Sequence, residues 1–101
     1  MVKMVVLYKT PGDREKFDSH YLGTHVPLCE KLPGVQRIEV TRFTKAMGGD
    51  PPFYLMTEIA WNTQAEMDAA LASPENKAVY RDARDNIEPG LMTVTFAEKA
   101  N

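Results

Sequence analysis

The order of strand-like and helix-like segments is the feature that most limits the fold of this chain. Runs of β-branched and apolar residues alternate with helical stretches in the order strand, helix, strand, strand, helix, strand. The strand-like segments are residues 1–9, 35–45, 53–61 and 91–98. Each half of about fifty residues repeats a strand, helix, strand pattern. We therefore predict an α+β domain in which a four-stranded antiparallel sheet carries its helices on one face.

This order is that of the ferredoxin-like βαββαβ sandwich. A chain of 101 residues corresponds to one domain, so we assign residues 1–101 to a single sandwich of this kind. The second helical stretch is expected in two pieces, because Thr63 opens a capping box and Ser73 precedes Pro74. The second piece should bury a stripe that consists of Val79, Ala83 and Ile87.

The first and third strands are apolar on both faces. In the first strand, Val5 and Leu7 alternate with Val6 and Tyr8, which are apolar as well. A sheet with one solvated face should alternate between polar and apolar residues, so this pattern requires a second cover. The simplest cover is a partner subunit. We predict a homodimer in which two facing sheets form a dimeric α+β barrel, with a pocket for a small molecule in its interior.

The stretch from Asp13 to Val35 places a histidine beside an expected break in a helix. Asp13 is a good N-cap, and Gly23 then interrupts the helical pattern. A proline is tolerated only in the first turn of a helix, so Pro27 predicts that a second short helix starts near His25. Such a break would hold His25 at a fixed position.

Two residues of this stretch are candidates for catalysis. His25 could act as a general base or acid towards a carbonyl or phenol, because histidine gains and loses a proton near neutral pH. Its alternative role is structural, as a helix cap that hydrogen-bonds the backbone. Tyr21 could orient a ligand through its hydroxyl, or it could be a core residue with a hydrated tip.

Three further residues are candidates for ligand binding. Phe17 lies four residues before Tyr21 on the same helix face, and His20 lies beside that face. Glu58 is a carboxylate in an otherwise apolar strand and could be an acid of the pocket. Its alternative role is an ion pair with Arg37 or Arg42 on the neighbouring strand.

Neither thiol chemistry nor metal binding is expected. Cys29 follows His25 by four residues, but nothing orients the histidine as the third member of a triad, and a single buried thiol is usually inert. His20 and His25 are five apart, which on an α-helix turns them away from each other. The chain also lacks a Cys/His cluster of ligand spacing, so we predict no metal.

The composition excludes several classes of partner. A net charge of −2 gives no field that would gather nucleic acid or anionic lipid. No segment approaches the roughly 20 apolar residues that cross a bilayer. The single cysteine fits a reducing compartment, and the N-terminal residues do not have the apolar run of a signal peptide, so we expect a cytoplasmic protein.

Several short motifs resemble the EthD family of the dimeric α+β barrel superfamily. The motifs that carry this resemblance are Phe17, His20-Tyr21, Thr24-His25-Val26-Pro27-Leu28 and Leu32-Pro33-Gly34-Val35, followed by Val40 and Arg42. The resemblance implies a homodimeric ferredoxin-like barrel and a family named for a protein needed in ethyl tert-butyl ether degradation beside a cytochrome P450 system. The wider superfamily includes monooxygenases without a cofactor, muconolactone-type isomerases, polyketide cyclases and haem-degrading enzymes, so the resemblance fixes the fold more firmly than the function.

Two functional hypotheses follow. The first is an enzyme without a cofactor, an oxidoreductase, isomerase or lyase of oxidative degradation or secondary metabolism, that acts on a small apolar or aromatic compound inside the barrel. In it His25 is the acid or base and Tyr21 orients the ligand. The second is a ligand carrier without catalytic activity, or an accessory protein of an oxygenase. Both need the pocket, and the sequence leaves both open.

Overall fold

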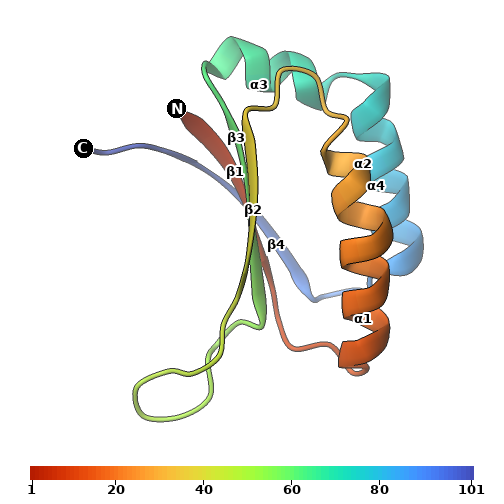
Figure 1. Cartoon of the computed structure of the whole chain (residues 1–101), viewed down its shortest axis with the longest axis vertical. Coiled ribbons are helices and arrows are strands. Elements are labelled where there is room, and N and C mark those ends of the chain that lie inside the picture. The colour runs from red at the N-terminus through yellow and green to blue at the C-terminus, as the bar shows by residue number, and fades with distance from the viewer.

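The structure, a computed structural model, describes residues 1–101 and has two layers. The sheet contains β1 (Val2–Tyr8), β2 (Arg37–Arg42), β3 (Leu55–Trp61) and β4 (Met92–Glu98), all paired antiparallel in the order β2-β3-β1-β4. The helices are α1 (Arg14–His20), η1 (Tyr21–His25), α2 (Val26–Cys29), α3 (Gln64–Leu71) and α4 (Pro74–Asn86). All of them cover one face of the sheet (Figure 1). The predicted α+β, ferredoxin-like fold is confirmed.

The core lies between the helices and one face of the two central strands. Met4 pairs with Ile59 and Tyr8 pairs with Leu55, so these side chains point to the same side, where they are buried. Trp61 is fully buried at the end of this row and donates from Nε1 to the carbonyl of Pro33 at 2.9 Å. Side chains of β1 and β3 therefore form the sheet side of the core.

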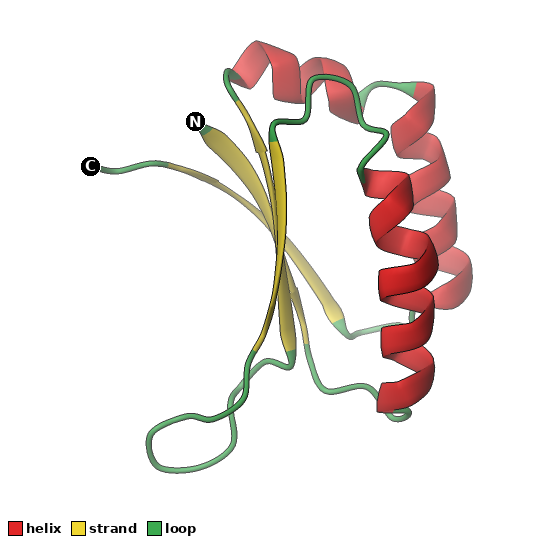
Figure 2. Ribbon diagram, viewed as in Figure 1, coloured by secondary structure: helices red, strands yellow, loops and turns green.

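The opposite face of the sheet has no helix on it (Figure 2). Val5, Leu7 and Met56 lie on this face and are only half-buried. Lys3 and Glu58 lie there too, and the Lys3 ammonium is 3.0 Å from the Glu58 carboxylate. The prediction that the central strands are apolar on both faces is confirmed. A second cover for this face is part of the proposal below.

The first helical stretch is continuous, so the predicted break at Gly23 is wrong. Residues 21–25 form a π-helix, and the Val26 N–H donates to the carbonyl of Tyr21 five residues earlier. His25 and Val26 both keep right-handed helical dihedrals, and the His25 side chain caps nothing. In a π-helix each backbone hydrogen bond spans five residues instead of four. This longer span accommodates Gly23 and Pro27, so the helix continues through both residues.

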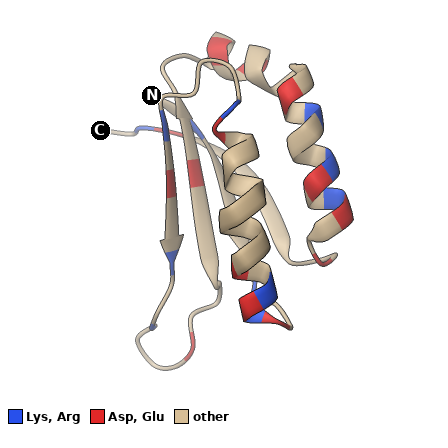
Figure 3. Ribbon diagram, turned by 45° about the vertical axis from the view of Figure 1, so that its right-hand side comes forward, with Lys and Arg blue, Asp and Glu red and all other residues tan.

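The two helices of the second helical stretch start at the predicted caps. The Thr63 hydroxyl accepts from the Glu66 N–H and starts α3, and the Ser73 hydroxyl accepts from the Asn76 N–H and starts α4. Val79 is buried and Ala83 is half-buried, so the predicted stripe faces the sheet. Acidic and basic residues lie along the outer side of α4 (Figure 3).

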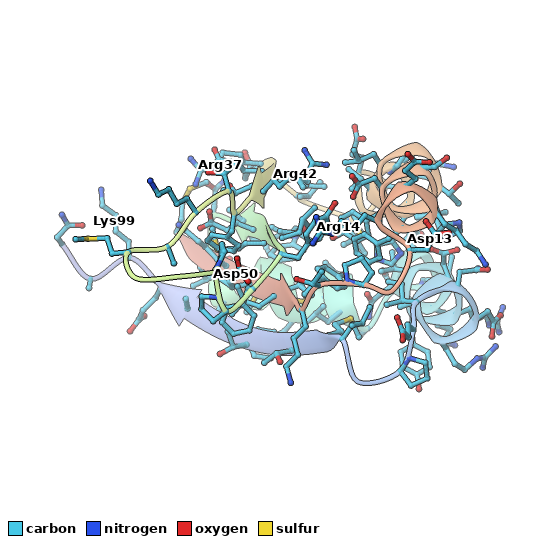
Figure 4. All side chains as sticks on the ribbon, turned by 90° about the horizontal axis from the view of Figure 1, so that it is seen from below. Asp13, Arg14, Arg37, Arg42, Asp50 and Lys99 are labelled. Carbon is cyan, nitrogen blue, oxygen red and sulfur yellow. The ribbon has the colours of Figure 1, made fainter.

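A polar cluster ties α1 to the sheet. The Tyr54 hydroxyl and the Arg42 guanidinium each donate to the Asp18 carboxylate at 2.9 Å. The guanidinium carbons of Arg14 and Arg42 lie 6.0 and 5.9 Å from the centre of the Tyr54 ring, and Figure 4 labels both arginines. Arg42 is thus paired with Asp18.

No helix is both long and apolar enough to cross a membrane.

Candidate functional site

The π-helix brings the two histidines of the chain to the same carboxylate. His20 precedes it and His25 ends it, and the i to i+5 repeat of this segment places residues five apart on one side. His20 Nε2 lies 2.9 Å from Asp82 Oδ1, and His25 Nδ1 lies 2.7 Å from Asp82 Oδ2. The expectation that these histidines point away from each other is therefore wrong, because it assumed a regular α-helix.

Asp82 lies on α4 and accepts hydrogen bonds from three side chains. Asn86, one turn further along α4, donates from Nδ2 to Asp82 Oδ1 at 3.0 Å, in addition to the two histidines. Partial burial by itself raises the pKa of Asp82, but the hydrogen bonds from His25 and His20 outweigh it and hold the net pKa below its usual value. Asp82 is therefore an ionised carboxylate at neutral pH.

The carboxylate determines which nitrogen of His25 carries the proton. An ionised carboxylate can only accept, so the His25 nitrogen that faces it, Nδ1, must be the donor. In the neutral imidazole Nε2 is then the acceptor. Nε2 has no hydrogen bond within the chain, yet no buried side-chain nitrogen or oxygen is left without a partner, so Nε2 keeps accessible surface.

A small apolar cavity adjoins His25. It lies between the helices and the covered face of the sheet, has a volume of about 170 Å³, and is lined by 15 residues of which 12 are hydrophobic. Tyr21 and Thr57 line it beside His25, and Met92 and Val94 of β4 line its outer side. His25 lines this cavity and is only 4% exposed, so we infer that the accessible edge of its ring faces the cavity.

Tyr21 lies between His25 and the rest of the aromatic core. Its ring stacks on His25 with centroids 5.2 Å apart, and on Phe17 with centroids 5.3 Å apart. Its hydroxyl is hydrogen-bonded to the Thr57 hydroxyl. Burial raises the pKa of Tyr21 to about 12, so the phenol stays neutral at physiological pH. Burial likewise raises the pKa of Tyr8 far above its usual value.

Cys29 also lines the cavity but has an unreactive thiol. The residue is 2% exposed, and burial, followed by the negative charges of Asp82 and Glu30, raises the pKa of the thiol to about 12. A thiol is a nucleophile only as its thiolate, which is almost absent at neutral pH under these conditions.

The other predicted site residues lie outside the cavity. Phe17 packs against Tyr21 and Tyr8 in the core, and His20 lies behind Asp82 with its side chain 28% exposed. Glu58 is on the helix-free face, so it is not near His25, and its partner is Lys3 instead of the arginines of β2.

These positions correct the predicted location of the pocket. From the sequence, His25 and Tyr21 are expected inside a barrel formed by two facing sheets. Both residues instead lie on the helical side of the sheet, and their cavity is lined by elements of one chain and is partly open to solvent. No group of three or more His, Cys, Asp or Glu side chains is arranged to hold a metal ion.

Asp82 and Thr57 are site residues that the sequence analysis did not identify. A signal for Asp82 was present, because it lies three residues after Val79 and next to Ala83, on the predicted buried stripe of α4. A carboxylate at such a position needs a partner when it is buried. Thr57 is a polar residue that points to the covered face of β3, and it had the same kind of signal.

Comparison with known proteins identifies relatives along the whole chain. Residues 9–88 match the EthD domain. The "uncharacterized 11.0 kDa protein in thcB-thcC intergenic region" of Rhodococcus erythropolis is 30% identical over 99 residues, which are 98% of this chain and 95% of the relative. The crystal structure of an ethyl tert-butyl ether D (EthD) family protein from Bacillus halodurans is similar with a TM-score of 0.92 and 36% identity, over 98% of both chains.

More distant structures share the fold alone. A dimeric ferredoxin-like protein from Jannaschia has a TM-score of 0.69 at 13% identity, over 97% of this chain and 98% of that one. SnoaB from Streptomyces nogalater, a cofactor-independent oxygenase, has a TM-score of 0.67 at 18% identity, over 99% of this chain and 93% of that one.

Proposed function

The chain belongs to the EthD family, and on that premise we propose that it is a cofactor-independent enzyme that acts on a small apolar or aromatic compound, with His25 as its acid or base. The observation that carries the proposal is the 2.7 Å hydrogen bond from His25 Nδ1 to Asp82, which leaves Nε2 as an acceptor at an apolar cavity. A carboxylate behind a histidine orients the ring and stabilises the imidazolium that forms when Nε2 takes a proton.

The reaction class that this pair supports is proton transfer to and from the ligand. An oxidoreductase, isomerase or lyase without a cofactor needs such a step at a C–H or O–H group. Tyr21 holds one wall of the cavity, with its ring stacked on His25 and its hydroxyl fixed by Thr57. In this proposal Tyr21 orients the ligand mainly by the position of its ring. Its neutral phenol adds no charge to the site.

The size of the cavity limits the ligand. A cavity of about 150 Å³ in another protein binds benzene, and drug-sized ligands occupy about 300 Å³ or more. The cavity here, at about 170 Å³, fits a compound with a single ring or of similar bulk. A place in oxidative degradation or secondary metabolism would suit such a compound. The description of SnoaB as a cofactor-independent oxygenase is compatible with this role, although that likeness concerns the fold.

The protein is proposed to act as a homodimer. Val5, Leu7 and Met56 leave an apolar strip on the helix-free face, and a second copy of this face would cover it. The Jannaschia protein with the same fold is described as dimeric. Because the cavity lies on the other side of the sheet, each subunit carries its own site in this arrangement.

A carrier or an accessory protein of an oxygenase is the second candidate. It is favoured by the lining of the cavity, since 12 of its 15 residues are hydrophobic and would hold an apolar ligand without reacting with it. The two candidates differ in whether the proton transfer of His25 matters.

The deciding experiment is incubation of a panel of single-ring compounds with the protein in D₂O under air, followed by mass spectrometry. The enzyme hypothesis expects conversion or deuterium uptake by at least one compound. It also expects His25→Asn to lower that rate by roughly 10² to 10⁴ and to lower ligand affinity much less. Binding without conversion or exchange, with equal affinity in both proteins, would contradict the enzyme and support the carrier.

A further inference from the structure

We propose that the cavity selects a neutral hydrogen-bond donor, namely a single-ring phenol or an enol of that size, whose O–H points at His25 Nε2. This inference rests on the proposed function and names the ligand class of the same site. It follows from the proton positions that Asp82 imposes and from the hydrogen bonds that the Tyr21, Thr57 and Asn76 side chains already make.

Asp82 makes His25 an acceptor towards the cavity. The carboxylate accepts from His25 Nδ1 at 2.7 Å and is itself held by His20 Nε2 at 2.9 Å and by Asn86 Nδ2 at 3.0 Å. These two further donors hold the carboxylate in place. The neutral His25 ring cannot reverse its tautomer without placing a lone pair against a negative charge.

Three neighbouring polar side chains of the cavity already have partners within the chain. The Tyr21 and Thr57 hydroxyls bond each other, and Asn76 Nδ2 donates to the carbonyl of Leu71 at 2.9 Å. Nε2 of His25 therefore presents an unused lone pair to a ligand. An apolar ring that covers this nitrogen without donating to it leaves a buried acceptor unpaired, and that costs more than an ordinary hydrogen bond gains.

Charge limits the class of ligand further. A preformed phenolate is disfavoured, because an anion would enter an apolar cavity that has no Lys or Arg in its lining and whose His25 is bonded to the Asp82 carboxylate. The neutral phenol avoids this cost. Once it is bound, its proton can move from oxygen to Nε2, which leaves a phenolate beside an imidazolium that Asp82 stabilises; no other bond changes in this step.

The test is calorimetric titration of the whole protein with phenol, anisole and toluene, which share one ring and differ in the group that meets Nε2. We expect phenol to bind about 10- to 100-fold more tightly than either analogue. Asp82→Asn should remove most of this preference, because it no longer fixes the tautomer. Asp85→Asn removes the same charge from an exposed position of α4 and should leave the preference unchanged.

The outcomes separate this inference from the proposed function. Equal affinity for phenol and toluene, or tighter binding of anisole than of phenol, would overturn the inference and leave a site for small aromatic compounds. Failure of all three probes to bind at concentrations up to their solubility would remove the proposed function itself. If Asp82→Asn does not fold, the wild type still decides. Phenol should shift the ¹⁵N signal of His25 Nε2 more than toluene does, and equal shifts would overturn the inference.

Discussion

His25 and Asp82, 57 positions apart in the chain, are joined by a hydrogen bond of 2.7 Å between Nδ1 and Oδ2. This contact links the π-helical segment to α4. Both side chains are largely shielded, at 5% and 9% exposure, so water competes little for the bond. The chemistry proposed for the cavity depends on this contact.

The first prediction concerns Gly23. The helix runs through this position, and a Cβ added there would meet no atom within 4 Å. Replacing a helical glycine with alanine removes an entropic cost of about 0.5–1 kcal/mol, so Gly23→Ala should raise the free energy of unfolding by about that amount. Urea denaturation measures it. Gly34→Ala is the control and should be destabilising, because Gly34 has a φ of 69°. A loss of stability in Gly23→Ala would indicate that the glycine does break the helix.

The second prediction concerns pH and Asp82. Its pKa in the folded protein lies below the unfolded value of about 3.9, so its stabilising contribution is complete above that value and is lost as the pH falls through the folded pKa. The difference in the free energy of unfolding between wild type and Asp82→Asn should therefore be largest above about pH 4 and shrink at lower pH. Urea denaturation of both proteins between about pH 2.5 and about pH 6 tests this prediction. A difference that stays constant over this range would show that Asp82 makes no special contacts in its ionised form.

The third prediction concerns Cys29. The thiol is buried and its pKa is raised to about 12, so it should react with thiol reagents only when the protein opens. Cys29→Ala should cost about 1 kcal/mol or less and leave ligand binding and any turnover nearly unchanged. Rapid labelling of the native protein, or lost turnover in a well-folded variant, would restore the thiol as a candidate nucleophile.

The fourth prediction concerns the helix-free face. Sedimentation at micromolar concentration should give about twice the chain mass of 11.4 kDa. Leu7→Lys places a charge in the apolar strip of that face and should produce a folded monomer. Ala69→Lys adds the same charge on the exposed side of α3 and should remain dimeric. A wild type that sediments as a monomer at high concentration would remove the dimer.

The sequence predicts the fold well because local signals agree with it. The Thr63 and Ser73 caps, the two-sided apolar strands and the stripe through Val79 each depend on near neighbours in the chain. The π-helix could not be predicted in this way. Gly23 and Pro27 favour a break, and the helix continues because the buried Tyr21 and His25 hold both ends of the segment in the core.

The site was predicted only in part, for the same physical reason. His25 and Tyr21 are neighbours through helical spacing, which a sequence displays. The residues that hydrogen-bond them come from other elements. Asp82 is 57 positions from His25, and Thr57 is 36 positions from Tyr21. The side of the sheet on which Glu58 lies is set by the register of β3, and that register separates it from His25.

The most direct test of the account is the protonation state of His25 in the resting protein. A ¹⁵N-resolved NMR spectrum of the imidazole groups, recorded near neutral pH, distinguishes a nitrogen that carries hydrogen from one with a free lone pair. We expect Nδ1 of His25 to carry the proton and Nε2 to be free, and we expect this pattern to be lost in Asp82→Asn but kept in Asp85→Asn. A neutral His25 whose proton resides on Nε2 would contradict the account, because the cavity would then face a donor and His25 could not serve as its base.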